Sequence, residues 1–121
     1  MESVLILCEK GPFGTNSGME SIRLGAGYIA LGEDLDCKLV FYGAGVLNLL
    51  KNLDPSQIGM DLMDEGIEMA DLSELPIVLV NEDLEQFGYT QADLIEYESL
   101  ELVSRAELPS ILKEFDMVFR M

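Results

Sequence analysis

Few side chains in this sequence are able to perform covalent chemistry at neutral pH. The 121 residues contain no histidine, so the chain has no imidazole base, no imidazole metal ligand and no Cys–His or Ser–His pair. Its two cysteines, Cys8 and Cys37, are too few for a disulfide framework or a cysteine-rich zinc site, and we expect no metal. Cys8 is the candidate reactive thiol, although a cysteine in an apolar segment is more often a buried, unreactive side chain.

Three polar loops follow apolar segments and together predict one ligand-side edge. They span residues 9–16, 43–45 and 81–83. In an open parallel sheet, ligands bind beyond the carboxyl ends of the strands. The candidate ligand-side residues in and beside these loops are Gly11, Gly14, Thr15, Asn16, Ser17, Gly43, Gly45 and Asn81.

The segment 9–17 leads into a predicted helix, and its composition has two interpretations. A loop of small polar residues before a helix N-terminus suits a phosphate or a flavin phosphate group, with Lys10 as the counter-charge. Alternatively, Ser17 and Glu20 form a capping box, while Gly11 and Gly14 permit a tight turn. We favour the capping interpretation, because the acidic excess of the chain opposes an anionic cofactor, and we expect no cofactor.

The segment Gly43-Ala44-Gly45 is half of a dinucleotide-binding fingerprint. Asn48 stands where the third glycine would be needed, and the segment follows the second predicted strand instead of the first. We therefore interpret it as a turn.

Apolar runs alternate with helix-like segments along the whole chain, which predicts an α/β fold with parallel strand pairing. The predicted strands are residues 3–8, 37–42, 75–80, 100–103 and 116–121. The predicted helices are residues 18–31, 46–51, 57–70, 81–87 and 104–114, the last of which contains an S-x-x-E capping box and an awkward Pro109. If the first two strands are parallel neighbours, Cys8 and Cys37 lie too far apart for a disulfide.

The net charge of −16 limits the partners of this chain. Residues 52–104 contain no Lys or Arg, and such a surface repels nucleic-acid phosphates and anionic membranes. We interpret the charge as a solubilising surface, which also permits a basic protein partner. We expect a single domain over residues 1–121 and a cytoplasmic location, since no apolar run reaches bilayer length and no secretory signal begins the sequence.

Three segments resemble the DsrE/DsrF-like family, most closely its DsrF/TusC-type sulfur-relay subunits. They are the pattern Pro12-Phe13-Gly14-Thr15-x-x-Gly18-x-Glu20, the segment 41–46 followed by Leu49-Leu50, and the ending 116–121. The resemblance covers the whole chain. It implies a three-layer α/β/α fold around a five-stranded, mostly parallel sheet, and an oligomer built with related DsrE/TusD-like and DsrH/TusB-like subunits or with copies of itself.

The resemblance also implies a role in intracellular sulfur transfer, toward tRNA thiolation or in sulfur oxidation. In such complexes one subunit carries sulfur as a persulfide on a cysteine just after the third strand. Here that position reads Leu79-Val80-Asn81-Glu82, without a cysteine. The resemblance therefore implies an accessory, non-catalytic subunit. A sulfur carrier that uses Cys8, and a phosphate or flavin binder that uses loop 9–17, are the alternatives.

Overall fold

The computed structural model describes residues 2–11, 17–31, 35–50, 68, 70–72 and 74–120. Within this part of the chain, five strands form one sheet in the order β4-β3-β2-β1-β5. The strands are β1 (Glu2–Cys8), β2 (Leu35–Phe41), β3 (Ile77–Val80), β4 (Leu100–Val103) and β5 (Met117–Arg120). All four pairings are parallel, which confirms the predicted α/β fold with a parallel sheet.

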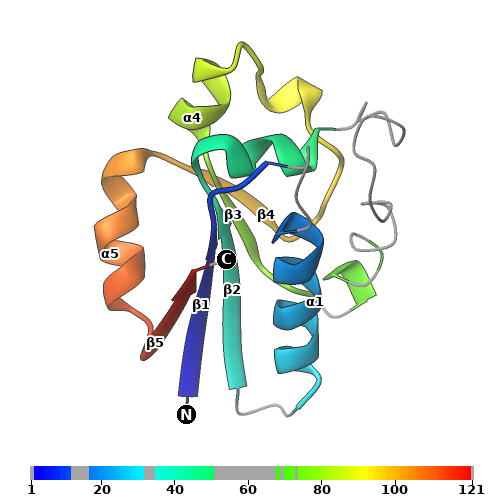
Figure 1. Cartoon of the computed structure of the whole chain (residues 1–121), viewed down its shortest axis with the longest axis vertical. Coiled ribbons are helices and arrows are strands. Elements are labelled where there is room, and N and C mark those ends of the chain that lie inside the picture. The colour runs from blue at the N-terminus through cyan, green and yellow to red at the C-terminus, as the bar shows by residue number, and fades with distance from the viewer. Residues whose placement is uncertain are drawn as a thin grey trace.

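The three central strands are mostly buried on both faces. For β1, its consecutive apolar residues predict this burial. Val4, Ile6 and Cys8 of β1 belong to one buried cluster, and Leu5 and Leu7 of the same strand belong to another. Two helices cover these two faces. Figure 1 shows α1 (Ser17–Ile29) and α5 (Leu108–Lys113) on opposite sides of the central strands.

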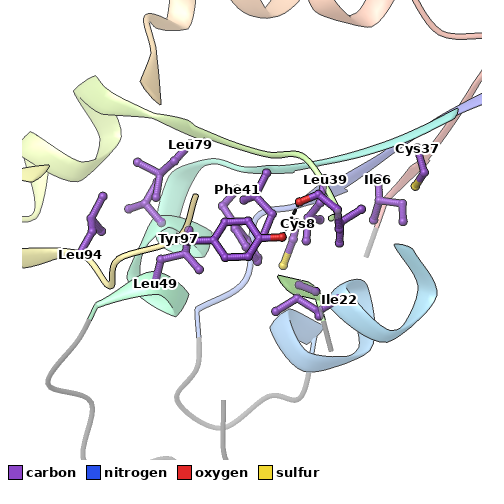
Figure 2. Close-up of a cluster of buried hydrophobic side chains, with 14 of the residues drawn as sticks. Ile6, Cys8, Ile22, Cys37, Leu39, Phe41, Leu49, Leu79, Leu94 and Tyr97 are labelled. Carbon is purple, nitrogen blue, oxygen red and sulfur yellow. Dashed lines mark hydrogen bonds between the residues drawn. The ribbon is translucent and has the colours of Figure 1, made fainter. Parts of the chain in front are cut away.

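The α1 side of the sheet holds the larger core. Ile22 of α1 packs into it together with Phe41 and Leu79. Figure 2 shows this cluster, in which the ring of Tyr97 lies among the aliphatic side chains. The hydroxyl of Tyr97 donates a hydrogen bond of 2.6 Å to the backbone carbonyl of Leu75. The polar end of this buried ring therefore has the hydrogen-bond partner that it needs.

The strand register confirms that the two cysteines cannot form a disulfide. Cys37 lies opposite Val4 in the pairing of β1 with β2, whereas Cys8 lies opposite Phe41. Four residues of extended strand separate the two positions, about 13 Å at ~3.3 Å per residue. Both thiols are free and buried, and Figure 2 shows them at separate places in the core.

The remaining helices are short and gather beyond the carboxyl ends of the strands. The 3-10 helix η1 (Gly43–Leu49) follows β2 and begins three residues earlier than the predicted helix 46–51, because Gly43 itself starts the helical turn. Helix α4 (Asn81–Gln86) follows β3, and a further 3-10 turn, η2 (Gln91–Asp93), was not predicted. Figure 1 shows η1 and α4 together at the top of the sheet.

The predicted helix 104–114 is divided in two. Ser104 and Glu107 form the predicted capping box, but they cap the 3-10 turn η3 (Arg105–Glu107). Helix α5 starts after it, with Pro109 in its first turn, where a missing N–H costs nothing. Most of the predicted helix 57–70 lies outside the described residues. None of the helices in the described ranges is long and apolar enough to cross a membrane.

Candidate functional site at the carboxyl rim of the sheet

Four parallel strands end at the same edge of the sheet, and the residues that follow them lie side by side. We call this edge the rim: residues 9–11 after β1, 42–45 after β2, 81–83 after β3, and 104–105 after β4. The loops are tied to one another by hydrogen bonds. The N–H of Tyr42 donates to the carbonyl of Cys8 at 3.1 Å, and the N–H of Arg105 donates to the carboxylate of Glu82.

Gly45 lies very close to the backbone at the end of β1. A Cβ atom at this position would lie 2.2 Å from the carbonyl oxygen of Cys8, a separation that real Cβ atoms essentially never show. Gly43 has a φ of +55°, a conformation that favours glycine. Both glycines are therefore required by the turn itself, and a phosphate ligand is not needed to explain them.

Asp83 connects three of the strand-end loops through one carboxylate. It is 4% exposed, and it accepts a 2.7 Å hydrogen bond from the N–H of Gly43. The guanidinium of Arg105 forms an ion pair with its other oxygen. A buried carboxylate needs such partners, since an unpaired one costs several kcal/mol. The turn after β3 is thus fixed by its own charge network.

Cys8 lies below the rim, in the core. Its side chain is 0% exposed, and its sulfur lies 3.6 Å from the carbonyl of Lys10 as a weak donor. Burial raises the pKa of the Cys8 thiol, an effect partly offset by hydrogen bonding from Ser21 and by the nearby charge of Lys10. A protonated, inaccessible thiol is a poor nucleophile.

Cys37 is equally unsuited to thiolate chemistry. Burial, with a smaller contribution from the charge of Asp36, raises the pKa of its thiol to about 11. It also lies at the opposite end of the sheet from the rim, opposite Val4. Across the described residues, no group of three or more Cys, Asp or Glu side chains is placed to hold a metal ion.

Asn48 is a buried amide that joins η1 to the first loop. Its Nδ2 donates hydrogen bonds of 2.9 Å to the carbonyls of both Lys10 and Gly45. Its Oδ1 accepts no hydrogen bond from the described residues. The residue that breaks the dinucleotide fingerprint therefore has a structural task in this chain, because it holds two rim loops together.

The structure places four of the eight predicted ligand-side residues at the rim. A Cβ at Gly11 would lie 3.2 Å from the carbonyl oxygen of Ala44, so Gly11 lies beside the segment that contains Gly43 and Gly45. Asn81 begins α4, and its amide donates to the carboxylate of Glu85 at 2.9 Å. Gly14, Thr15 and Asn16 lie outside the described residues. Ser17 begins α1, but its side chain is not described. Whether any of the eight binds a ligand stays a prediction.

Sequence reasoning missed the three residues that organise the rim, namely Asn48, Asp83 and Arg105. One signal for Arg105 was present, because it is the first basic residue after the long acidic stretch and directly follows a predicted strand and one polar residue. For Asp83, the signal was its place in the turn after the third strand. Neither signal reveals that the two side chains pair with each other.

The parallel five-stranded sheet, with helices on both faces and a glycine-bearing rim, defines a small layered α/β protein. The chain belongs to the DsrE/DsrF-like family, whose model matches residues 2–120. No curated protein matches it. Two solved structures share the fold, and each alignment covers 100% of this chain and 100% of the solved chain. YchN from E. coli has a TM-score of 0.82 and 21% sequence identity. MTH1491 from Methanobacterium thermoautotrophicum, a protein of unknown function, has a TM-score of 0.71 and 15% sequence identity.

Family membership supports a role related to sulfur relay in general terms. Members of this family work in multi-subunit complexes. The surfaces of this chain that could meet other chains are therefore candidate functional sites in addition to the rim.

Proposed function

We propose that this chain is an accessory, non-catalytic subunit of a DsrEFH/TusBCD-like sulfur-relay complex and acts through protein interfaces. The observation that carries the proposal is the turn after β3, where a sulfur carrier of this family would hold its cysteine. The turn contains no thiol, and Asp83 in it is committed to Gly43 and Arg105. A persulfide carrier needs an accessible thiolate, which this turn does not supply.

The burial of Cys8 also supports an accessory role. A carrier that used Cys8 in place of the missing cysteine would need its sulfur exposed, whereas the side chain is 0% exposed and burial raises its thiol pKa. Loading with a polysulfide donor, followed by intact-protein mass spectrometry, tests this point. We expect no persulfide of mass +32 on Cys8 in the native protein, and a stoichiometric adduct would refute the accessory role.

An accessory subunit also needs a surface for its partners, and the edge strand β5 offers one. Met117, Val118 and Phe119 are 49%, 43% and 43% exposed, although the β1 residues paired with them are buried. Because paired residues in a parallel sheet point to the same side, β5 exposes apolar side chains on both faces. We propose that a related subunit or a second copy of this chain covers β5.

Native mass spectrometry of the complex purified from its source tests the interface proposal. We expect this chain together with related DsrE/TusD-like or DsrH/TusB-like subunits, or as a homo-oligomer. Replacing Phe119 with Glu should break the assembly, because a charge would be buried in the contact. The matched control is Glu114→Gln, an exposed change near the same terminus. A wild-type protein that stays monomeric at all concentrations, and without partners in the source, would contradict the proposal.

A further inference from the structure

The opposite edge of the sheet, at β4, has open backbone groups. The N–H of Ile77 donates to the carbonyl of Ser99, and Ile77 is in register with Leu100. The backbone groups of alternate β4 residues therefore point toward β3, and those of Leu100 and Leu102 point away from the sheet. The N–H of Leu100 is used by a turn to the carbonyl of Tyr97, but the N–H and carbonyl of Leu102 have no partner among the described residues.

Hollows in three parts follow this edge, and the first part shares lining residues with each of the other two. One part, of about 660 Å³, lies between residues 91–98 and the half-buried side chains of Leu100 and Leu102. A second part, of about 560 Å³, continues toward α4 and shares Gln91 and Leu102 with the first. A third part shares Asp71 with the first, at the other end of the strand. We call the three parts together the β4 groove.

The lining of the β4 groove is acidic and has an apolar floor. Its floor is formed by Leu94, Ile95, Leu100 and Leu102. The carboxylates along it are Asp71, Glu74, Glu82, Glu85, Glu96, Glu98 and Glu107. No Lys or Arg of the described chain lines it. Arg105 lies nearby, but its guanidinium is paired with Asp83.

We propose that the β4 groove binds an extended, basic segment of a partner protein, which adds to the sheet as a strand beside β4. The N–H and carbonyl of Leu102, which point away from β3 and have no partner in the described part of the chain, supply the backbone hydrogen bonds of strand addition. Alternate side chains of the added segment face the apolar floor, and Lys or Arg side chains meet the carboxylates. The proposal deepens the accessory role and rests on it for the expectation that this chain works through other proteins.

Charge selects this occupant over a second copy of the chain. A second copy carries the same net charge of −16, so its approach to an acidic groove is opposed. A basic segment is attracted, and its attraction should weaken with salt because exposed charges are screened. Seven carboxylates along one edge thus favour a ligand of positive charge.

The test uses the whole protein and a fluorescein-labelled synthetic peptide of alternating Val and Lys residues. We expect saturable binding by fluorescence polarisation, weakened about tenfold or more when salt rises from low to high concentration. We also expect the amide of Leu102 to become protected from hydrogen exchange when the peptide binds, because strand addition pairs that N–H. A peptide of alternating Val and Glu should not bind.

Two double variants with equal charge change separate the groove from general attraction. Glu96→Gln with Glu98→Gln removes two charges from the groove, and we expect binding to weaken about fivefold. Asp36→Asn with Glu114→Gln removes two exposed charges elsewhere and should leave binding within about twofold. All four side chains are exposed, so neither variant disturbs the core.

Several results would overturn the proposal. They are absence of binding, equal weakening by both double variants, or binding without protection of the Leu102 amide. Protection of that amide in the protein alone, rising with concentration, would assign the groove to a second copy. These outcomes are separate from a failure of the accessory role, which a persulfide on Cys8 or a partner-free monomer in the source would show.

Discussion

Replacing Gly45 with alanine is the most direct test of how the rim is built. The new Cβ would lie 2.2 Å from the carbonyl oxygen of Cys8, so the two atoms must separate by about 0.8 Å to reach even the 3.0 Å limit. The obstacle is backbone, which no rotamer change relieves. The same carbonyl accepts the hydrogen bond from the N–H of Tyr42, so the movement also disturbs the link between β1 and β2.

The expected cost of Gly45→Ala is about 3 kcal/mol of unfolding free energy, the upper end of the ~1–3 kcal/mol typical of overpacking. Urea denaturation followed by far-UV circular dichroism measures it. The matched control is Gly27→Ala in α1, where a Cβ meets nothing within 4 Å in the described structure. That variant should gain about 0.5–1 kcal/mol from helix propensity. A Gly45→Ala protein within about 0.5 kcal/mol of wild type would refute the close approach.

Three further predictions concern buried polar groups. Arg105→Met should lower the free energy of unfolding, measured by urea denaturation, by about 2 kcal/mol, because it leaves the buried Asp83 carboxylate without its ion-pair partner. The control Arg23→Met, which breaks an exposed ion pair, should lower it by less than about 0.5 kcal/mol. Equal losses in the two variants would contradict the charge network around Asp83. Tyr97→Phe should lower the free energy of unfolding by about 1–2 kcal/mol, since the buried carbonyl of Leu75 loses its hydrogen-bond donor at 2.6 Å. An unchanged midpoint of urea denaturation would show that water replaces the hydroxyl. Burial raises the pKa of Cys37 to about 11, so the folded state keeps a proton that the unfolded state releases above about pH 9. The free energy of unfolding should therefore fall between pH 9 and 11, by up to about 1.4 kcal/mol per pH unit from this group. Urea denaturation at several pH values should show a smaller fall for Cys37→Ala than for the wild type. An equal fall in both proteins would show that Cys37 does not contribute.

The strands were predictable because short runs rich in apolar residues stand between polar segments of the sequence. The segment Leu100–Val103 was predicted with the bounds that the structure has, and the first strand differs by one residue at its start. Helix boundaries were less certain where two signals competed. Ser104 and Glu107 correctly predicted a capped start, but Pro109 lies five residues after the cap, and the chain satisfies both by ending a 3-10 turn before α5 begins.

The rim was only partly predictable because its key contacts join residues far apart in sequence. Gly43 and Gly45 carry a local signal for a turn, and that interpretation agrees with the structure. The contact of Asp83 with Gly43 spans 40 residues, and its pairing with Arg105 spans 22. Local composition shows only a glycine turn after one strand and charged residues after two others. Which of them meet depends on strand order and register, which composition does not determine.

The same contacts are consistent with the proposed accessory role. A turn that carries sulfur as a persulfide must expose that sulfur, so that a thiolate of a partner protein can reach it. In this chain the turn after β3 has the opposite character, because Asn81 is bonded to Glu85 and Asp83 is held by Gly43 and Arg105. The polar groups that could have served chemistry stabilise the fold instead. Among the described residues, the apolar edge at β5 and the acidic edge at β4 stay open, and both are better suited to proteins than to small substrates.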